Sequence, residues 1–273
     1  MGYGDEIMAL GRAETIYSIL GKPVAICDTN GIPRKHCIWE NHPAVDSDSP
    51  LHIIDGPSVR PYILKWKRSN AGLTIVWNTK YRAHAGHIRL TAREQVEALD
   101  IMPKKPFAII EPIVRRGSSQ NKKWDIERWE EVIKNFPIPV YQFNLGEQTK
   151  ILCGAFLINS YGFRISAGIV EHASLVMTVE GGMHHMAASM NTPAVVVFGG
   201  FADPKITGYI YQKNFYVELP ESPCGKYYPC KHCKKAMSMI YPDKVRKAAL
   251  KILNKERSDE TGYLRRSNKN YRY

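Results

Sequence analysis

A pair of adjacent glycines between an apolar run and a helical pattern marks the segment best suited to chemistry. Segment 179–185, VEGGMHH, follows the apolar run 175–179 and leads into a helix that the apolar spacing predicts over 183–190. Glycine at such a turn lets a phosphate approach the free backbone N–H groups of the helix N-terminus, where the helix dipole favours negative charge. Gly181 and Gly182 therefore form a candidate diphosphate site. A tight turn followed by space-filling histidines is an equally good interpretation of the same residues.

A group of cysteines near residue 230 offers ligand chemistry. Cys230 and Cys233 have the Cys-x-x-Cys spacing of metal ligands, Cys224 precedes them, and His232 lies between them. No fourth ligand is evident from the spacing. Free thiols in a lysine-rich loop are the default interpretation, and a structural metal or a redox-sensitive pair is the alternative. We therefore expect no metal, with Cys224, Cys230 and Cys233 as weak candidates for ligands.

Three motifs together resemble those of glycosyltransferase family 9, the heptosyltransferase-like enzymes. Glu180, Gly181, Gly182 and His185 occupy positions of the family's donor-site signature, which precedes a small-residue helix and a Pro-led strand. Segments 107–112 (FAIIEP), 121–124 (NKKW) and 127–129 (ERW) resemble its strand-Pro, Lys-x-Trp and helix arrangement, and segment 2–9 (GYGDEIMA) is similar to its Gly-x-Gly-Asp loop. The motifs occur in the family's order and spacing, and the resemblance covers most of residues 104–250 together with the opening loop and helix.

The resemblance implies an enzyme that moves a sugar from a nucleoside diphosphate sugar to an acceptor hydroxyl, by inverting, metal-independent transfer. It implies that Asp5 is the catalytic base, and that Gly2, Tyr3 and Gly4 form the loop on the acceptor side. An N-cap role needs the same aspartate in the same place, and the two roles are compatible. Lys122 would meet the donor phosphate and stabilise the leaving group. No cofactor is expected besides the donor substrate.

Glu147 is a weaker candidate for the same donor site. It follows a strand predicted over 140–143, and an acidic residue after a strand can bind a donor ribose. A solvated glutamate is an equal alternative.

The elements that must position these residues follow from apolar periodicity. The pattern predicts helices over 5–20, 91–99, 126–135, 165–172, 183–190 and 244–253, and strands over 23–27, 51–54, 73–77, 107–110, 140–143, 175–179 and 194–198. Uniformly apolar strands that alternate with amphipathic helices indicate a parallel sheet covered on both faces. We therefore expect an α/β protein whose second half is doubly wound.

The resemblance extends this expectation to two Rossmann-like domains that face a cleft, the B-type glycosyltransferase (GT-B) architecture, with a reduced N-terminal domain. We place an acceptor-side α/β domain at 1–103 and a nucleotide-sugar-binding domain at 104–254, since the proline-containing stretch 102–106 reads as a linker. The polar and basic stretch 255–273 is expected to be a flexible tail.

Composition narrows the partners and the location. The chain has 273 residues, of which 44% are hydrophobic, so it is neither disordered, collagenous nor a coiled coil as a whole. No apolar run reaches the roughly 18–20 residues that a membrane helix needs, and the first residues lack a signal-peptide pattern. The six cysteines do not resemble a disulfide framework. We expect a cytoplasmic protein, either free or peripheral at the inner membrane face.

The net charge of +12 favours polyanionic partners and leaves the acceptor open. A surface glycan or a lipid-linked saccharide is the acceptor that the resemblance implies. A transferase that acts on modified DNA bases is one alternative, suggested by the charge and the basic tail. A non-catalytic nucleotide-binding or nucleic-acid-binding module is another, because Gly181 stands where the family has a serine or threonine.

Overall fold

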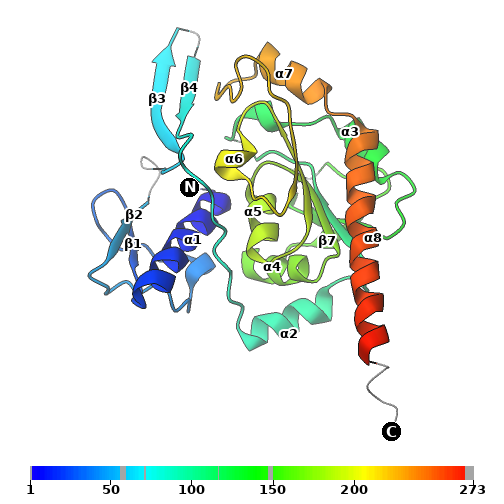
Figure 1. Ribbon diagram of the computed structural model, residues 1–273, viewed down its shortest axis with the longest axis horizontal. Coiled ribbons are helices and arrows are strands. Elements are labelled where there is room, and N and C mark those ends of the chain that lie inside the picture. Colours follow the sequence, from blue (N-terminus) through cyan, green and yellow to red (C-terminus); the bar gives the residue numbers. More distant parts are fainter. Residues whose placement is uncertain (1, 56–59, 71, 116, 147–149, 268–273) are drawn as a thin grey trace.

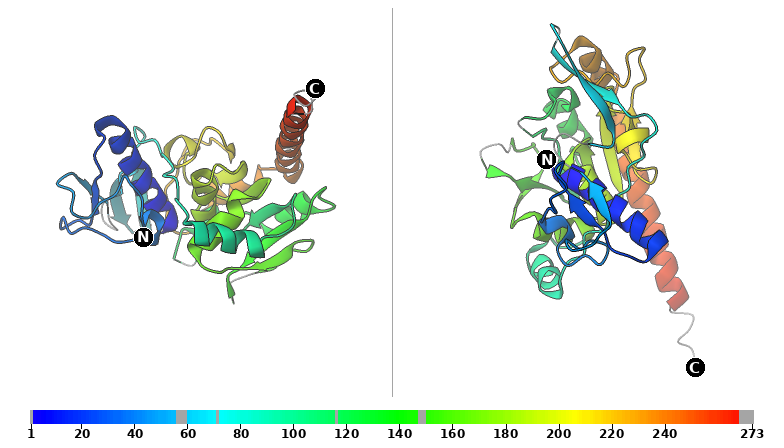
Figure 2. Two further views of the ribbon diagram at one scale, coloured as in Figure 1. Left: turned by 90° about the horizontal axis from the view of Figure 1, so that it is seen from below. Right: turned by 90° about the vertical axis from the view of Figure 1, so that its left-hand side faces the viewer.

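The computed structural model describes residues 2–55, 60–70, 72–115, 117–146 and 150–267, with side chains described up to residue 255. Its elements form a small unit, built from the first part of the chain, beside a larger unit built on a six-stranded sheet (Figure 1, Figure 2). No helix in the described ranges is long and apolar enough to cross a membrane.

The small unit begins with helix α1 (Tyr3–Leu20), which ends at Gly21 in the left-handed conformation that glycine adopts readily. Strands β1 (Ala25–Cys27) and β2 (His52–Ile54) pair in parallel, and the short 3-10 helix η1 (Cys37–Trp39) lies between them in the sequence. Strands β3 (Ile63–Ser69) and β4 (Gly72–Trp77) form a separate antiparallel hairpin. The described part of the small unit therefore contains a two-stranded parallel sheet, helix α1, the short η1 and a hairpin.

The sheet of the larger unit is entirely parallel. Its strands are β5 (Ala108–Glu111), β6 (Val140–Asn144), β7 (Phe156–Asn159), β8 (Leu175–Val179), β9 (Ala194–Gly199) and β10 (Lys213–Tyr216). They lie in the order β7-β6-β5-β8-β9-β10. The chain thus moves outward from β5 to one edge and returns to place β8 on the other side of β5, the strand order of a doubly wound Rossmann sheet. The predicted parallel α/β fold is confirmed.

Helices cover both faces of this sheet, and residues of each strand alternate between them. Ile109 and Val176 join the core shared with α1, α4 (Phe163–Glu171) and α5 (Gly182–Ser189). Ile110 and Met177 face the opposite core, with α3 (Ile126–Ile133) and α8 (Pro242–Ser267). Because successive side chains of a strand point to opposite faces, uniformly apolar strands are what a sheet covered on both sides requires.

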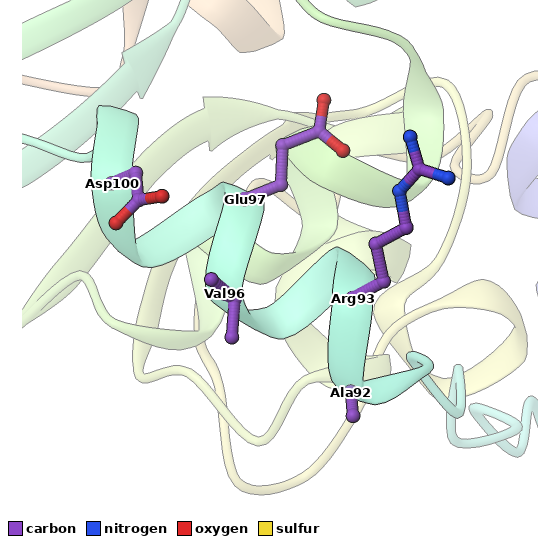
Figure 3. A pocket seen from close by; sticks show the side chains of 5 residues that line it. All are labelled: Ala92, Arg93, Val96, Glu97 and Asp100. Atoms are coloured by element: carbon purple, nitrogen blue, oxygen red, sulfur yellow. The ribbon is translucent and has the colours of Figure 1, made fainter.

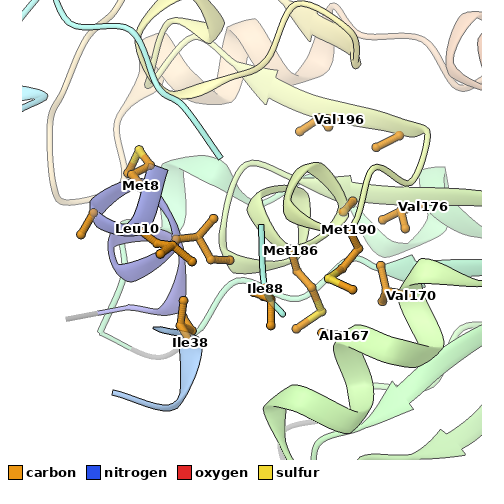
Figure 4. Packing of buried hydrophobic residues seen from close by; sticks show 14 of the residues in the cluster. Met8, Leu10, Ile38, Ile88, Ala167, Val170, Val176, Met186, Met190 and Val196 are labelled. Carbon is orange, nitrogen blue, oxygen red and sulfur yellow. The ribbon is translucent and has the colours of Figure 1, made fainter. Parts of the chain in front are cut away.

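One core joins the two units. Met8 and Leu10 of α1 belong to the same buried cluster as Met186 of α5 and Met190, which directly follows α5 (Figure 4). Helix α2 (Ala92–Ile101) precedes the expected boundary at 103/104 and nevertheless packs against α4 of the larger unit. A Cβ at Gly168 of α4 would lie 2.6 Å from the Ala98 Cβ. The small unit is therefore held against the sheet layers by shared apolar packing.

The last helix is longer than predicted. Helix α8 continues to Ser267, past the predicted helix end at residue 253, and residues 268–273 lie outside the described residues. The reason is the number of Lys, Glu, Arg and Leu residues beyond Leu253, which have high helix propensity without an apolar stripe. The remaining elements are α6 (Pro204–Thr207), α7 (Lys231–Ser238) and the 3-10 helix η2 (Gln120–Lys122).

Candidate functional site

The point at which the strand order reverses lies between β5 and β8. In open α/β sheets, ligands bind outside the carboxyl ends of the strands at this switch point. The chain that leaves β5 leads to Lys122 at the end of η2, and the chain that leaves β8 enters the turn Glu180–Gly181. Lys122 Nζ lies 2.5 Å from Glu180 Oε2, and their side chains are 19% and 7% exposed. The sheet topology therefore brings together Lys122 and Glu180, two residues predicted to bind the donor substrate, as an ion pair.

The N-terminus of α5 is open beside this pair. A Cβ added to Gly181 or Gly182 would meet no heavy atom within 4 Å. Gly181 has an extended backbone, and its N–H donates to His184 Nδ1 at 2.9 Å. The N–H groups of the first turn have no partner within the helix, and their dipole adds partial positive charge. The turn therefore offers anion-binding groups together with the space that a ligand needs.

The two histidines of this helix are buried and neutral. His184 accepts from Gly181 at Nδ1, so Nε2–H donates to the Thr207 carbonyl at 3.0 Å. His185 Nδ1 lies 2.7 Å from the Tyr209 hydroxyl, and burial holds the pKa of His185 well below its usual value. Glu180, His184 and His185 lie close enough to hold a metal ion. Both ring nitrogens of His184 are already engaged, so this group does not fit one.

Asp5 lies in the first turn of α1, and its carboxylate is held on several sides. Oδ2 accepts the Gly2 N–H at 3.0 Å and lies 3.7 Å from an Arg60 guanidinium nitrogen. Oδ1 accepts the Tyr62 hydroxyl. Gly2 is the N-cap residue of α1, so Asp5 is not the N-cap itself; from the third helical position its side chain accepts the Gly2 N–H, as in a capping box. The Asp5 side chain remains 12% exposed.

A close contact between helices brings Asp5 to the donor residues. A Cβ on Gly4 would lie 2.3 Å from His185 Cδ2, so only glycine lets α1 approach α5 this closely. Tyr62 bridges the same space. Burial, together with the charges of Asp5 and Glu180, raises the pKa of its phenol well above the usual value, so it stays protonated and donates.

The predicted residues Gly2, Gly4, Asp5, Lys122, Glu180, Gly181, Gly182 and His185 therefore come from three elements that meet at one place. Two predicted residues are not part of this group. Tyr3 stacks on Phe163 of α4 with ring centroids 4.0 Å apart, and Glu147 lies outside the described residues.

Sequence reasoning missed the charged and aromatic residues that surround Asp5. Arg60 and Tyr62 precede β3 without any motif, and fold back on α1 through tertiary contacts. Arg12 lies 3.2 Å from Asp55, and burial raises the pKa of that carboxyl to about 7. The one available signal was the mixture of Arg, Pro and Tyr at 60–62.

The cysteines predicted as weak metal candidates are clustered. Cys224, Cys230 and Cys233 place their sulfur atoms together with a ring nitrogen of His232, within 4.8 Å of one another. The fourth donor that the spacing did not reveal is therefore present. Hydrogen bonds from Cys233 and from the Lys226 backbone lower the pKa of Cys224 to about 6.

A surface hollow of about 480 Å³ lies elsewhere, along the outer side of α2 (Figure 3). Ala92, Arg93, Val96, Glu97 and Asp100 line it, all from this one helix and all exposed. Since the described residues that line it all come from one helix and polar groups do not converge on it, this hollow is not a candidate active site.

Comparison with known proteins identifies the fold. No family model matches the sequence, and no curated protein matches it. A glycosyl transferase family 9 protein from Veillonella parvula is 16% identical with a TM-score of 0.63, over 93% of this chain and 95% of that one.

A second similar structure is the iron-containing dodecameric glycosyltransferase TibC of enterotoxigenic E. coli. It is 15% identical with a TM-score of 0.62, over 93% of this chain and 74% of that one. TibC in complex with ADP-D-beta-D-heptose gives 14% identity and a TM-score of 0.64, over 93% and 75%. The chain therefore has the GT-B-type fold of these glycosyltransferases, and the expected fold class is confirmed.

Proposed function

We propose that this chain transfers a sugar from a nucleoside diphosphate sugar to an acceptor hydroxyl. The observation that carries the proposal is the Lys122–Glu180 ion pair at the switch point, beside the open N-terminus of α5, the helix against which α1, which carries Asp5, packs. A cation, unpaired backbone N–H groups and a carboxylate from a separate element are the groups that such a transfer uses. The fold is that of known glycosyltransferases, which supports the same activity.

The donor diphosphate would lie between Lys122 and the first turn of α5. Lys122 Nζ would exchange Glu180 for phosphate oxygens, while the N–H groups after Gly181 bind the opposite side. These positive groups stabilise the charge that builds on the diphosphate as it leaves the sugar, so this step needs no metal ion. His185 is buried and neutral, so it adds no charge beside the donor.

Asp5 would act as the general base. Its carboxylate would accept the proton of the acceptor hydroxyl as the oxygen attacks the anomeric carbon, on the face opposite to the departing diphosphate. A single displacement of this kind inverts the configuration of the sugar. Tyr62 and the Gly2 N–H fix the orientation of the carboxylate, and the remaining lone pairs of Asp5 are available to the acceptor.

We propose an anionic saccharide, either a cell-surface glycan or a lipid-linked one, as the acceptor. Strand β3 starts directly after Tyr62 and exposes Lys65, Lys67 and Arg68 along its length. Their charge would attract phosphate or carboxylate groups of an acceptor or of an anionic membrane surface. The described cysteines are all unpaired, which fits a cytoplasmic location.

Nucleotide binding tests the donor half of this proposal. We expect one nucleoside diphosphate from a panel of ADP, GDP, UDP and CDP to raise the Tm of the wild-type chain by mass action. Lys122→Ala should abolish most of this rise, and Lys123→Ala, which alters the exposed neighbour, should leave it unchanged. Gly181→Ala should fold normally, because its Cβ meets nothing, and should bind the nucleotide more weakly.

Equal rises in Lys122→Ala and wild type would contradict the donor site. No rise with any nucleotide, together with salt-sensitive binding of duplex DNA, would favour a nucleic-acid-binding module instead.

A further inference from the structure

We propose that Cys224, Cys230, Cys233 and His232 bind one structural metal ion in tetrahedral coordination, and that this ion fixes the segment that carries Lys122. The donor set of three thiolates and one imidazole suits zinc best, and iron is the other ion that it accommodates. With four protein ligands such a site is closed, so its role is to hold the chain together. The metal site stands independently of the proposed transferase activity.

The spacing of the four donor atoms matches a tetrahedral ion. With metal–sulfur bonds of ~2.3 Å, sulfur atoms of a tetrahedral site lie ~3.8 Å apart. Cys224 Sγ lies 3.7 Å from Cys230 Sγ and 3.2 Å from Cys233 Sγ. His232 Nδ1 lies 3.6 Å from Cys233 Sγ. A small outward shift of one sulfur is enough to admit the ion.

The tautomer of His232 is set for a metal ligand. Ser222 Oγ donates its proton to the Val217 carbonyl and accepts the Leu219 N–H. The same oxygen lies 3.2 Å from His232 Nε2, so it accepts a proton from that nitrogen. Nε2 is therefore the protonated nitrogen, and the lone pair of Nδ1 faces the three sulfurs. An imidazole oriented by a second hydrogen bond in this way is the usual arrangement of a metal-binding histidine.

The backbone around the cysteines also fits thiolate ligands. The N–H of Lys226 lies 3.4 Å from Cys224 Sγ, and the N–H of Cys233 lies 3.4 Å from Cys230 Sγ. Donors of this kind stabilise the negative charge of a thiolate sulfur. Gly225, which directly follows Cys224, makes a turn at φ +62°. A Cβ there would lie 2.3 Å from the Ile75 carbonyl oxygen, so only glycine fits this position.

The loop 224–233 is bonded to the residue beside Lys122. The Asn121 side chain donates to the carbonyls of Lys226 and Tyr228 at 2.6 and 2.8 Å, and its oxygen accepts the Cys230 N–H at 2.9 Å. Asn121 is buried, and Lys122 follows it at the end of η2. An ion that fixes loop 224–233 therefore also fixes Asn121, and through it the starting point of the Lys122 side chain.

Metal analysis of the purified full chain tests the site. We expect about one equivalent of zinc or iron per chain, and, after exchange with Co²⁺, the visible absorption of tetrahedral cobalt with a thiolate-to-cobalt band in the near ultraviolet. Cys230→Ser and His232→Ala should lose both signals. Cys153→Ser, which removes an exposed cysteine elsewhere, should keep them. Ser222→Ala should weaken metal binding by about tenfold, since it releases the histidine.

A second measurement covers variants that fail to fold. A chelator added to the wild-type chain should lower its Tm by several degrees, and added zinc should restore it. Failure of the reduced wild type to take up zinc or Co²⁺ overturns the proposal, as does full metal binding by Cys230→Ser. A Cys224–Cys233 disulfide that reforms in place of metal uptake also overturns it.

The link to Lys122 rests on the proposed function and is tested separately. In the metal-free wild type we expect at least tenfold weaker binding of the nucleoside diphosphate that stabilises the loaded protein. Unchanged nucleotide affinity after metal removal would refute the positioning role and leave the metal site standing. Absence of nucleotide binding in the loaded protein would refute the donor site instead.

Discussion

Replacing Glu111 by glutamine should change how stability depends on pH. Glu111 lies at the carboxyl end of β5 and is 7% exposed; Oε1 accepts the Ile113 N–H, while Oε2 is buried without a hydrogen-bond partner in the described structure. Burial disfavours the charged form and raises the pKa of Glu111 from 4.5 to about 7. Between pH 4.5 and about 7, Glu111 keeps its proton in the folded protein and has lost it in the unfolded chain.

The sign and size of the effect follow from this difference. Each pH unit in that window lowers the free energy of unfolding by ~1.4 kcal/mol, because the folded state binds more protons than the unfolded state. The contribution of the protonated Glu111 to the free energy of unfolding is fully present below pH 4.5 and is lost as the pH rises to about 7. The total loss from this group is ~3 kcal/mol. Glutamine resembles the protonated acid and stays neutral, so the variant does not incur this loss.

Urea unfolding at several pH values measures the effect. We expect the free energy of unfolding of Glu111→Gln, relative to wild type, to rise by ~3 kcal/mol between pH 4.5 and 8. Glu97→Gln, which alters an exposed carboxylate of α2, should track wild type at every pH. A difference between Glu111→Gln and wild type that stays constant over this range would refute the reasoning.

Three further changes have distinct expected outcomes. Gly4→Ala places a methyl group against His185 and should cost about 1–3 kcal/mol of the free energy of unfolding; a variant as stable as wild type would show that α1 and α5 do not meet as described. Arg164→Ala removes the bidentate ion pair with Glu94 at 2.5 and 2.8 Å and should cost about 3–5 kcal/mol in urea unfolding, whereas a loss below 1 kcal/mol would contradict it. Tyr62→Phe removes the hydroxyl bound to the aspartate of α1, and steady-state kinetics should show kcat reduced about tenfold with donor affinity within twofold of wild type. Equal loss of both would assign Tyr62 to donor binding.

Regular elements with a strong apolar pattern could be predicted from the sequence. Strand β8 has the predicted bounds 175–179, and α1, α2 and α5 differ from prediction by at most a few residues. Strands such as β8 are easy to recognise because burial of both sheet faces makes them uniformly apolar. Strand β3 could not be predicted because its residues from Leu64 onward are exposed and have no apolar pattern. Only its pairing with β4 defines it as a strand.

The candidate site divides in the same way. The glycine turn and Lys122 belong to local motifs that follow strands, and the reversal of strand order then brings them together. Arg60 and Tyr62 reach Asp5 across a long stretch of chain, and no spacing rule marks such a contact. His232 could not be assigned as a fourth donor, because its orientation depends on a hydrogen bond to Ser222 that only the folded loop creates.

Turnover of the donor is the most direct test of the central claim. We incubate the wild-type chain with the nucleotide sugar whose nucleoside diphosphate raises its Tm. The chain should release that nucleoside diphosphate slowly when water accepts the sugar, and faster when the correct acceptor is present. Asp5→Asn should bind the donor with unchanged affinity and release at least a hundredfold less, since a positioned general base contributes roughly 10²–10⁴-fold. Release by Asp5→Asn at the wild-type rate would contradict the assignment of Asp5 as the base, and a wild-type chain that binds the donor but never releases its diphosphate would contradict the proposed transfer itself.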